Sequence, residues 1–139
     1  MEFTIYFKQL NQFLTKHFGK YSYGKYIPEW AKRISPELKK ALLQGYLDSD
    51  GCVYKQGKYS VTGFVSVNLG LLEDVQDILF SLGIISNISK LRGSKTHTIC
   101  NKKCKVKSCY QLRMAQHDSV IFKSFYTNYD HKLEKIQEV

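Results

Sequence analysis

The chain has 139 residues, of which 43% are hydrophobic and 14% aromatic. These fractions exclude a disordered chain, and the length suits one domain with a single core. Lys and Arg outnumber Asp and Glu by 21 to 12, and the formal net charge of +9 indicates a polyanionic partner. Nucleic acid is favoured over a membrane, because no basic amphipathic anchor and no apolar run of bilayer length is present. The alternative is a soluble protein with a lysine-rich surface.

The chain starts without a secretory signal pattern, so we expect an intracellular protein, in the cytoplasm, nucleoid or an organelle, with reduced cysteines.

Apolar residues at steps of three and four predict a helix over residues 3–18. Residues 20–26, which are rich in Tyr, Lys and Gly, predict a loop. A second helix begins at Ser35, which can cap it, and Pro36, which suits the first helical position. This helix contains Gly45, whose cost in mid-helix is about 1 kcal/mol relative to alanine. Close approach of a second copy of the same helix would explain the glycine.

Two strands are predicted between Val53 and Asn68, joined by a turn at 56–58. Further along the chain we predict a helix over 71–82, a strand over 84–92, a polar and basic excursion over 93–107, a strand over 108–115, a helix over 117–127 and a short helix near Asp130. Two hairpins separated by a helix indicate an α+β fold, with one antiparallel sheet and helices packed on one of its faces.

Alternation along the second strand predicts that Val61, Val65 and Val67 share one face and that polar side chains share the other. A curved sheet with a polar face suits a DNA groove, where such side chains read base edges. The residues expected on this DNA-binding face are Thr62, Ser66, Asn68, Gln111 and Arg113.

The run from Leu42 to Val53 is an apolar segment that stops at Asp48, Asp50 and Gly51. Acids are unfavourable at a helix C-terminus, because that end already carries partial negative charge. A divalent metal would offset this charge, since hard cations bind carboxylate and carbonyl oxygens. The alternative is an ordinary turn, in which Asp tolerates the left-handed region and Gly supplies a positive φ.

The segment Leu43–Gly51, LQGYLDSDG, resembles the signature of the LAGLIDADG homing endonucleases. Lys25–Pro28 is similar to the lead-in of intein-type members. Residues 64–84 look like their second strand and second helix, and residues 125–135 look like their closing segment. The resemblance therefore covers nearly the whole chain and implies their fold, helix-strand-strand-helix-strand-strand-helix with a curved antiparallel sheet.

The resemblance implies one endonuclease domain over residues 1–139, with 1–34 as an N-terminal helical extension and lead-in and 35–139 as the core. The implied activity is site-specific hydrolysis of phosphodiester bonds in double-stranded DNA with Mg²⁺ or Mn²⁺, as in intron or intein homing. The alternative on the same fold is a nucleic-acid-binding protein that does not cleave, such as a maturase or a transcription regulator.

Roles are implied residue by residue. Asp50 would bind the metal, helped by the carbonyl of Gly51. Lys132, with Lys135 as the alternative, matches the lysine that tunes the nucleophilic water in many members. Asn68 matches the polar residue that approaches the metal-bound water.

Only one signature is present, and members with one signature act as homodimers. The implied dimer interface is the helix from Leu43 to Gly51, with contacts at Leu43, Gly45 and Tyr46. The intein-like lead-in keeps open one half of a two-motif intein endonuclease. The chain neither begins with Cys or Ser nor ends in His-Asn, so we do not expect a whole intein.

The basic excursion permits two interpretations. His97, Cys100, Cys104 and Cys109 could form a structural Zn²⁺ site that staples a loop too polar to fold alone. The spacing departs from the commonest zinc pairs, and the alternative is a flexible basic loop that touches phosphates. The cations expected to contact DNA in and beside this region are Arg92, Lys102 and Lys103.

Overall fold

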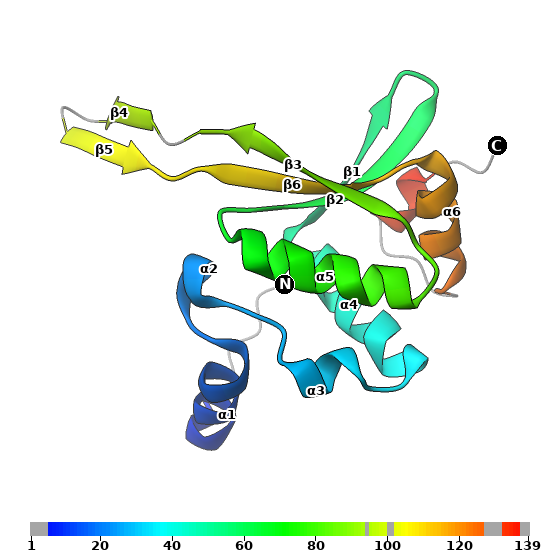
Figure 1. Ribbon diagram of the computed structural model, residues 1–139, viewed down its shortest axis with the longest axis horizontal. Helices are drawn as coiled ribbons and strands as arrows, with labels where there is room; N and C mark the ends of the chain where they lie inside the picture. Colours follow the sequence, from blue (N-terminus) through cyan, green and yellow to red (C-terminus); the bar gives the residue numbers. More distant parts are fainter. Residues whose placement is uncertain (1–5, 94, 100–101, 127–131, 137–139) are drawn as a thin grey trace.

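The computed structural model describes residues 6–93, 95–99, 102–126 and 132–136. Helices pack on one face of a four-stranded antiparallel sheet whose strand order is β1-β2-β6-β3, and a separate two-stranded ribbon, β4-β5, projects beyond it (Figure 1). The elements are α1 Lys8–Phe18, α2 Tyr21–Gly24, α3 Glu29–Lys32, α4 Pro36–Asp50, β1 Gly51–Gln56, β2 Tyr59–Ser66, α5 Leu69–Ser81, β3 Ser86–Arg92, β4 Lys95–Ile99, β5 Lys102–Val106, β6 Cys109–Met114, α6 Gln116–Ser124 and the 3₁₀ turn η1 Leu133–Lys135.

The predicted α+β fold is confirmed, and its helix boundaries follow the local signals. The Ser35 side chain accepts a hydrogen bond from the Leu38 amide, and Pro36 opens α4. The Asn68 side chain caps α5 in the same way. At the other end of α5, Gly83 has a φ of +80° and the Ile84 amide donates to the Leu79 carbonyl at 3.0 Å. This pairing is a Schellman end, which explains why a glycine follows that helix.

The core lies between the sheet and helices α4, α5 and α6. Its fully buried members include Phe64 from β2, Leu112 from β6, Leu47 from α4, Leu79 from α5 and Phe122 from α6. Phe64 and Leu112 lie directly opposite each other in the antiparallel register, so they share a face. This face is the one that the helices cover.

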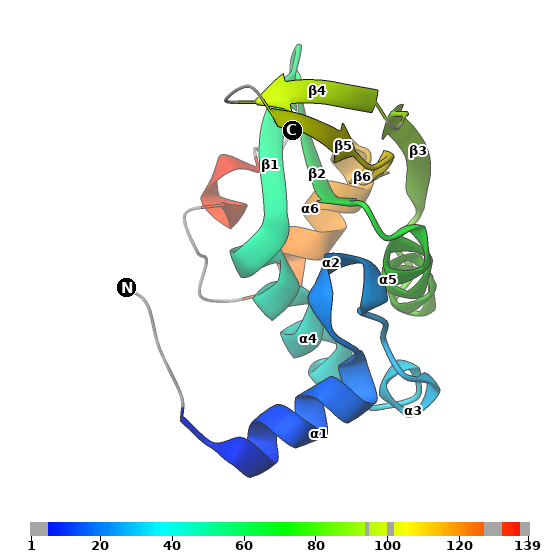
Figure 2. The same cartoon turned by 90° about the vertical axis from the view of Figure 1, so that its left-hand side faces the viewer.

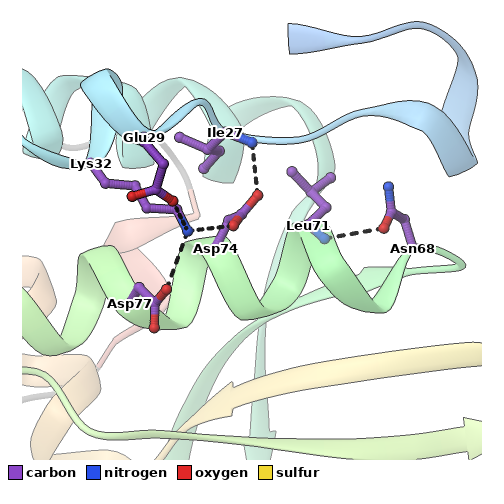
Figure 3. Close-up of polar contacts among 7 residues, drawn as sticks. All are labelled: Ile27, Glu29, Lys32, Asn68, Leu71, Asp74 and Asp77. Carbon is purple, nitrogen blue, oxygen red and sulfur yellow. Dashed lines mark hydrogen bonds and ion pairs between the residues drawn. The ribbon is translucent and has the colours of Figure 1, made fainter.

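The N-terminal segment is attached to α5 by two carboxylates, Asp74 and Asp77. Asp74 accepts a hydrogen bond from the Ile27 amide at 2.8 Å and pairs with the Lys32 ammonium at 2.6 Å (Figure 3). Asp77 and Glu29 each lie 3.2 Å from the same ammonium. The hydrogen bond with Asp74 is the main cause that raises the pKa of Lys32 well above its usual range. Ile27 and Ala31 are buried beside this cluster and join the core.

Candidate functional site

Helix α4 continues without interruption to Asp50, and Gly51 is already the first residue of β1. The Gly51 amide donates to the carbonyls of Tyr46 and Leu47, which closes the last turn. Gly51 has a φ of −78°, so it does not occupy the left-handed region that a simple turn would need. The turn alternative is therefore wrong, and Asp50 is the exposed last residue of the helix.

Gly51 is required by close packing. A Cβ atom at this position would lie 2.4 Å from Leu47 Cδ1 and 2.6 Å from Leu47 Cα. Leu47 is fully buried, so it has little freedom to move away. The glycine lets a helix and a strand join directly, and this direct junction fixes where Asp50 lies.

Lys132 supplies the positive charge that the last turn of α4 lacks. The Lys132 ammonium donates to the carbonyl oxygens of Leu47 at 2.6 Å and Asp48 at 2.7 Å. No basic residue belongs to that turn itself, and a cation at a helix C-terminus is favourable. Lys132 therefore lies beside the signature as the resemblance implies, and its contacts hold the end of the helix.

Asp50 borders a pocket of about 360 Å³ that also includes Ser22, Lys25, Tyr46 and Ser66. Burial and the charge of Asp50 raise the pKa of Tyr46 to about 12, so the phenol stays protonated at neutral pH. The Tyr46 ring stacks on Phe64 at 4.7 Å, which positions this wall of the pocket.

Lys25 was missed as a site residue by the sequence reasoning, although the lead-in motif contains it. The side chain of Asn68 holds the backbone here, because its amide nitrogen donates to the Lys25 carbonyl at 2.6 Å. The other end of the Asn68 amide accepts from the Leu71 amide at 3.1 Å (Figure 3). Asn68 thus joins the lead-in to the start of α5, and it is not among the residues that line the pocket. Its predicted catalytic role stays a prediction.

The predicted DNA-binding face of the sheet is partly wrong. Thr62 is fully buried, and its amide donates to the Ser119 hydroxyl of α6 at 3.1 Å. Ser66 alternates with Thr62 along β2 and so shares its face, and its hydroxyl accepts from the Asn68 amide. The Thr62 side chain therefore points into the core, which the sequence pattern did not predict, whereas the half-buried Ser66 borders the pocket beside Asp50 and its DNA contact stays a prediction.

The opposite face of the sheet carries the other two predicted residues. Gln111 and Arg113 lie on it, and the Gln111 amide donates to the Tyr54 hydroxyl at 3.4 Å. The β3–β6 register places Asn87 opposite Arg113. A hollow of about 520 Å³ at one end of this face is lined by polar and aromatic residues, including Gln56, Tyr59, Asn87, Arg113 and His117.

Two stretches of the excursion, residues 95–99 and 102–106, form an antiparallel ribbon, so the alternative of a flexible loop is wrong for these residues. Strands β4 and β5 pair from Lys95 opposite Val106 to Ile99 opposite Lys102. The side chains of Arg92, Lys103 and Lys105 are exposed. At the base of the ribbon, the Lys107 ammonium lies 3.6 Å from the centre of the Tyr23 ring. A cation–π contact of this kind attaches the ribbon to the N-terminal segment.

The predicted zinc ligands are only partly described. Cys100 lies outside the described residues, as do the side chains of His97 and Cys104, although these two residues pair across the ribbon. Cys109 is a buried free thiol in β6. Within the described ranges, no group of three or more His, Cys, Asp or Glu side chains could hold a metal ion.

The predicted dimer contacts divide between two sides of α4. Leu43 is 1% exposed and belongs to the chain's own core, so its assignment to an interface is wrong. Gly45 is exposed, and a Cβ atom there would meet nothing within 4 Å. The open side of the helix carries Leu38, Ala41 and Gly45.

Comparison with known proteins agrees with this architecture. A family model described as a LAGLIDADG-like domain matches residues 37–117. The large subunit of ribonucleoside-diphosphate reductase from Invertebrate iridescent virus 6 is 35% identical over 65 residues, and the match covers 47% of this chain and 7% of that subunit. In the part of the chain that the structure describes, every helix is too short or too polar to cross a bilayer. Members of the LAGLIDADG family typically are nucleases that bind DNA, and they generally use a divalent metal. Because the family model covers more than half of the 139 residues, the chain belongs to the LAGLIDADG-like domain family.

Proposed function

We propose that this chain is a site-specific endonuclease that hydrolyses phosphodiester bonds in duplex DNA with Mg²⁺ or Mn²⁺, acting as a homodimer through α4. The observation that carries the proposal is the exposed carboxylate of Asp50 at the end of α4, beside Lys25 in a pocket. An acid lies at this point of a protein whose net charge is +9. A negatively charged site on a positively charged surface suits a metal that bridges the protein and a phosphate.

One copy of the chain supplies some, but not all, of the oxygen ligands that a hard divalent cation needs. Asp48 and Asp50 supply exposed carboxylates at a helix end where partial negative charge already collects. The described residues of one copy do not gather three ligands, so a second copy or the phosphate oxygens would complete the set. When bound, the metal would activate water and neutralise charge on the scissile phosphate.

The remaining residues would bind and orient the duplex. The Lys25 ammonium would contact a phosphate next to Asp50, while Lys132 would hold the end of α4 in place. Gln111 and Arg113 would reach base edges from the open face of the sheet. The exposed cations of Arg92 and of the ribbon would contact flanking phosphates, which gives salt-dependent affinity.

A DNA-binding protein that does not cleave is the second candidate, and one observation favours it. The polar ends of Asn68 and Lys132, both predicted to serve catalysis, bond to backbone groups within the chain. Such contacts are sufficient to explain both residues structurally. The two candidates differ in whether Asp50 supports turnover.

Cleavage of a randomised-site plasmid library with Mg²⁺ or Mn²⁺ tests the proposal. We expect the wild type to cleave, chelation of the metal to stop it, and Asp50→Asn to abolish cleavage while DNA binding persists. Glu73→Gln is the matched control, because it also neutralises an exposed acid but lies on α5 outside the pocket. If the wild type binds DNA and cleaves no site with either metal, the second candidate replaces the first.

A further inference from the structure

Helix α2 carries two tyrosine rings that the fold leaves exposed. None of its residues is buried, and Tyr21 and Tyr23 are 61% and 59% exposed. Their rings stack on each other, with 6.1 Å between the centroids and 21° between the planes. An exposed pair of this kind contributes little to a core, since most of its apolar surface stays in contact with water. Packing within the chain therefore does not explain the two rings.

The loop that presents the rings is closed at its base. Gly19 has a φ of +76°, and a Cβ atom there would overlap the Gly24 carbonyl oxygen, so only glycine fits. The Tyr26 amide donates to the Phe18 carbonyl at 3.1 Å, which joins the two ends of the loop. These contacts hold the loop in place before any partner binds, which lowers the entropy that binding would cost.

The tip of the loop has an unfavourable backbone conformation. Tyr21 has a φ of +61°, and it is the one residue other than glycine with a positive φ in the part of the chain that the structure describes. A positive φ is an outlier for a bulky side chain. Burial does not offset it, because the Tyr21 ring stays largely exposed. Backbone outliers of this kind cluster at sites that bind a ligand, and this one places the Tyr21 ring beside that of Tyr23.

Lysine ammonium groups lie over both rings. The Lys20 Nζ atom is 5.0 Å from the centre of the Tyr21 ring, and the Lys107 Nζ atom is 3.6 Å from that of Tyr23. Neither ammonium forms an ion pair with a described residue. The two stretches of chain that supply this stack, residues 3–28 and 78–117, contain no Asp or Glu. The stack therefore offers flat aromatic surface within a positive field.

The stack adjoins the candidate site. Ser22, which lies between the two tyrosines in the chain, and Lys25 line the pocket that Asp50 borders. Figure 1 shows α2 below the junction of β5 and β6, and Figure 2 shows it between the end of α4 and α5. A DNA strand whose phosphate lies at Asp50 would therefore run close to the stack on one side of the cleavage point.

We propose that Tyr21 and Tyr23, together with Lys20 and Lys107, bind an unpaired nucleotide of the DNA strand beside the candidate site. This inference rests on the proposed function for DNA as the partner, and it adds a binding site that lies apart from the sheet. It also assigns that site a preference for a base that is not stacked in a duplex.

The chemistry of a nucleotide matches the stack in both of its parts. The base offers a flat face to a tyrosine ring, and the phosphate offers an anion to the ammonium groups, which would move to it from the rings. A base inside a duplex has both faces covered by its neighbours, so only an unpaired base has a face to offer. A run of acidic residues would pair with the lysines and leave the rings exposed, and for this reason a nucleotide is favoured over an acidic peptide.

Fluorescence anisotropy of the full chain without a divalent metal tests the inference, because no cleavage then interferes. The two probes are a thymidine oligonucleotide of about 16 nucleotides and an abasic strand of the same length, which has the same phosphates and no bases. We expect the wild type to bind the thymidine strand at least about 10-fold more tightly, from the stacking of one or two bases. Tyr21→Leu/Tyr23→Leu should abolish this difference, whereas Tyr21→Phe/Tyr23→Phe, which keeps both rings, should retain it.

Three controls separate stacking from charge and from folding. Tyr6→Leu/Phe80→Leu removes rings that are 95% and 74% exposed and lie outside the pocket, so the preference for bases should remain. Lys20→Gln/Lys107→Gln should weaken the binding of both strands and lower the slope of log affinity against log salt by about 0.7 for each lost phosphate contact. Circular dichroism should show that every variant is folded.

Three outcomes would overturn the inference. The first is a wild type that binds the two strands equally or binds neither. The second is a tyrosine-to-leucine double variant that keeps the preference for bases. The third is a loss of affinity for a blunt duplex in that variant as large as its loss for the thymidine strand, which would make the stack a contact to paired DNA.

The inference and the proposed nuclease can fail separately, because binding is measured without metal. A chain that prefers strands with bases but cleaves no DNA would support the stacking site and contradict the nuclease. A chain that cleaves duplex DNA and shows no preference for bases would support the nuclease and overturn the stacking site.

Discussion

Replacing Gly51 with alanine would place a methyl group where the chain has no room. The added Cβ atom would lie 2.4 Å from Leu47 Cδ1, 2.6 Å from Leu47 Cα and 2.8 Å from Leu47 O. Two of these atoms are backbone of a fully buried helical residue, so rotation of a side chain cannot relieve the clash. Overpacking of this kind costs about 1–3 kcal/mol. We expect the free energy of unfolding to fall by about 2 kcal/mol, and the end of α4 to separate from β1.

Urea unfolding followed by circular dichroism measures this effect, at one protein concentration because dimerisation would add to stability. Gly24→Ala is the control, since a Cβ atom at Gly24 meets nothing within 4 Å. It should change the free energy of unfolding by less than about 1 kcal/mol. If Gly51→Ala is as stable as the wild type, close packing against Leu47 does not explain the glycine.

Three further substitutions test contacts around α4 and α6. Lys132→Met removes two charge-assisted hydrogen bonds at the end of α4 and should cost about 2 kcal/mol in urea unfolding; equal stability of Lys132→Met and the wild type would show that the capping contacts contribute nothing. Burial and the charge of Asp48 raise the pKa of Tyr126, so its contribution to stability is present below pH 10 and is lost as the pH rises further. Tyr126→Phe should therefore show a smaller alkaline loss of melting temperature, and identical pH profiles would refute this reasoning. Ser119→Ala leaves the buried β2 amide without its acceptor and should cost about 1–3 kcal/mol, whereas the exposed Ser124→Ala should cost less.

The sequence predicted those parts of the fold that local signals determine. The start of α4 at Ser35 and Pro36, the hairpin turn around Gly57 and the end of α5 before Gly83 each depend on residues within one turn of the boundary. These boundaries are confirmed within a few residues. Asp50 was placed correctly at the end of α4 for the same reason, because the helix and its abrupt end are both local features.

The remaining features depend on contacts between distant segments. Alternation along β2 shows which side chains share a face, but it does not show which face the helices cover, and Thr62 was assigned to the wrong one. Lys132 bonds to carbonyls 84 and 85 residues earlier in the chain. Residues 93–107 lack an apolar alternation, and the ribbon there is formed by backbone pairing that polar side chains permit. None of these pairings leaves a signal within a local window of sequence.

Helix α4 contributes to the core, to an open side around Gly45 and to the candidate site at Asp50, and these three parts occupy different positions on the helix. Leu43 and Leu47 are four residues apart on the inner side, where they fill the core, and Gly45 lies between them on the open side. Asp50 follows Gly45 by about 7.5 Å along the axis, at the rise of an α-helix. Because Gly51 joins the helix to β1 without a loop, any movement of α4 that adjusts packing at Gly45 also moves Asp50 relative to the sheet. A helix held at its end by Lys132 and by the strand therefore couples the position of the candidate site to the contact on its open side.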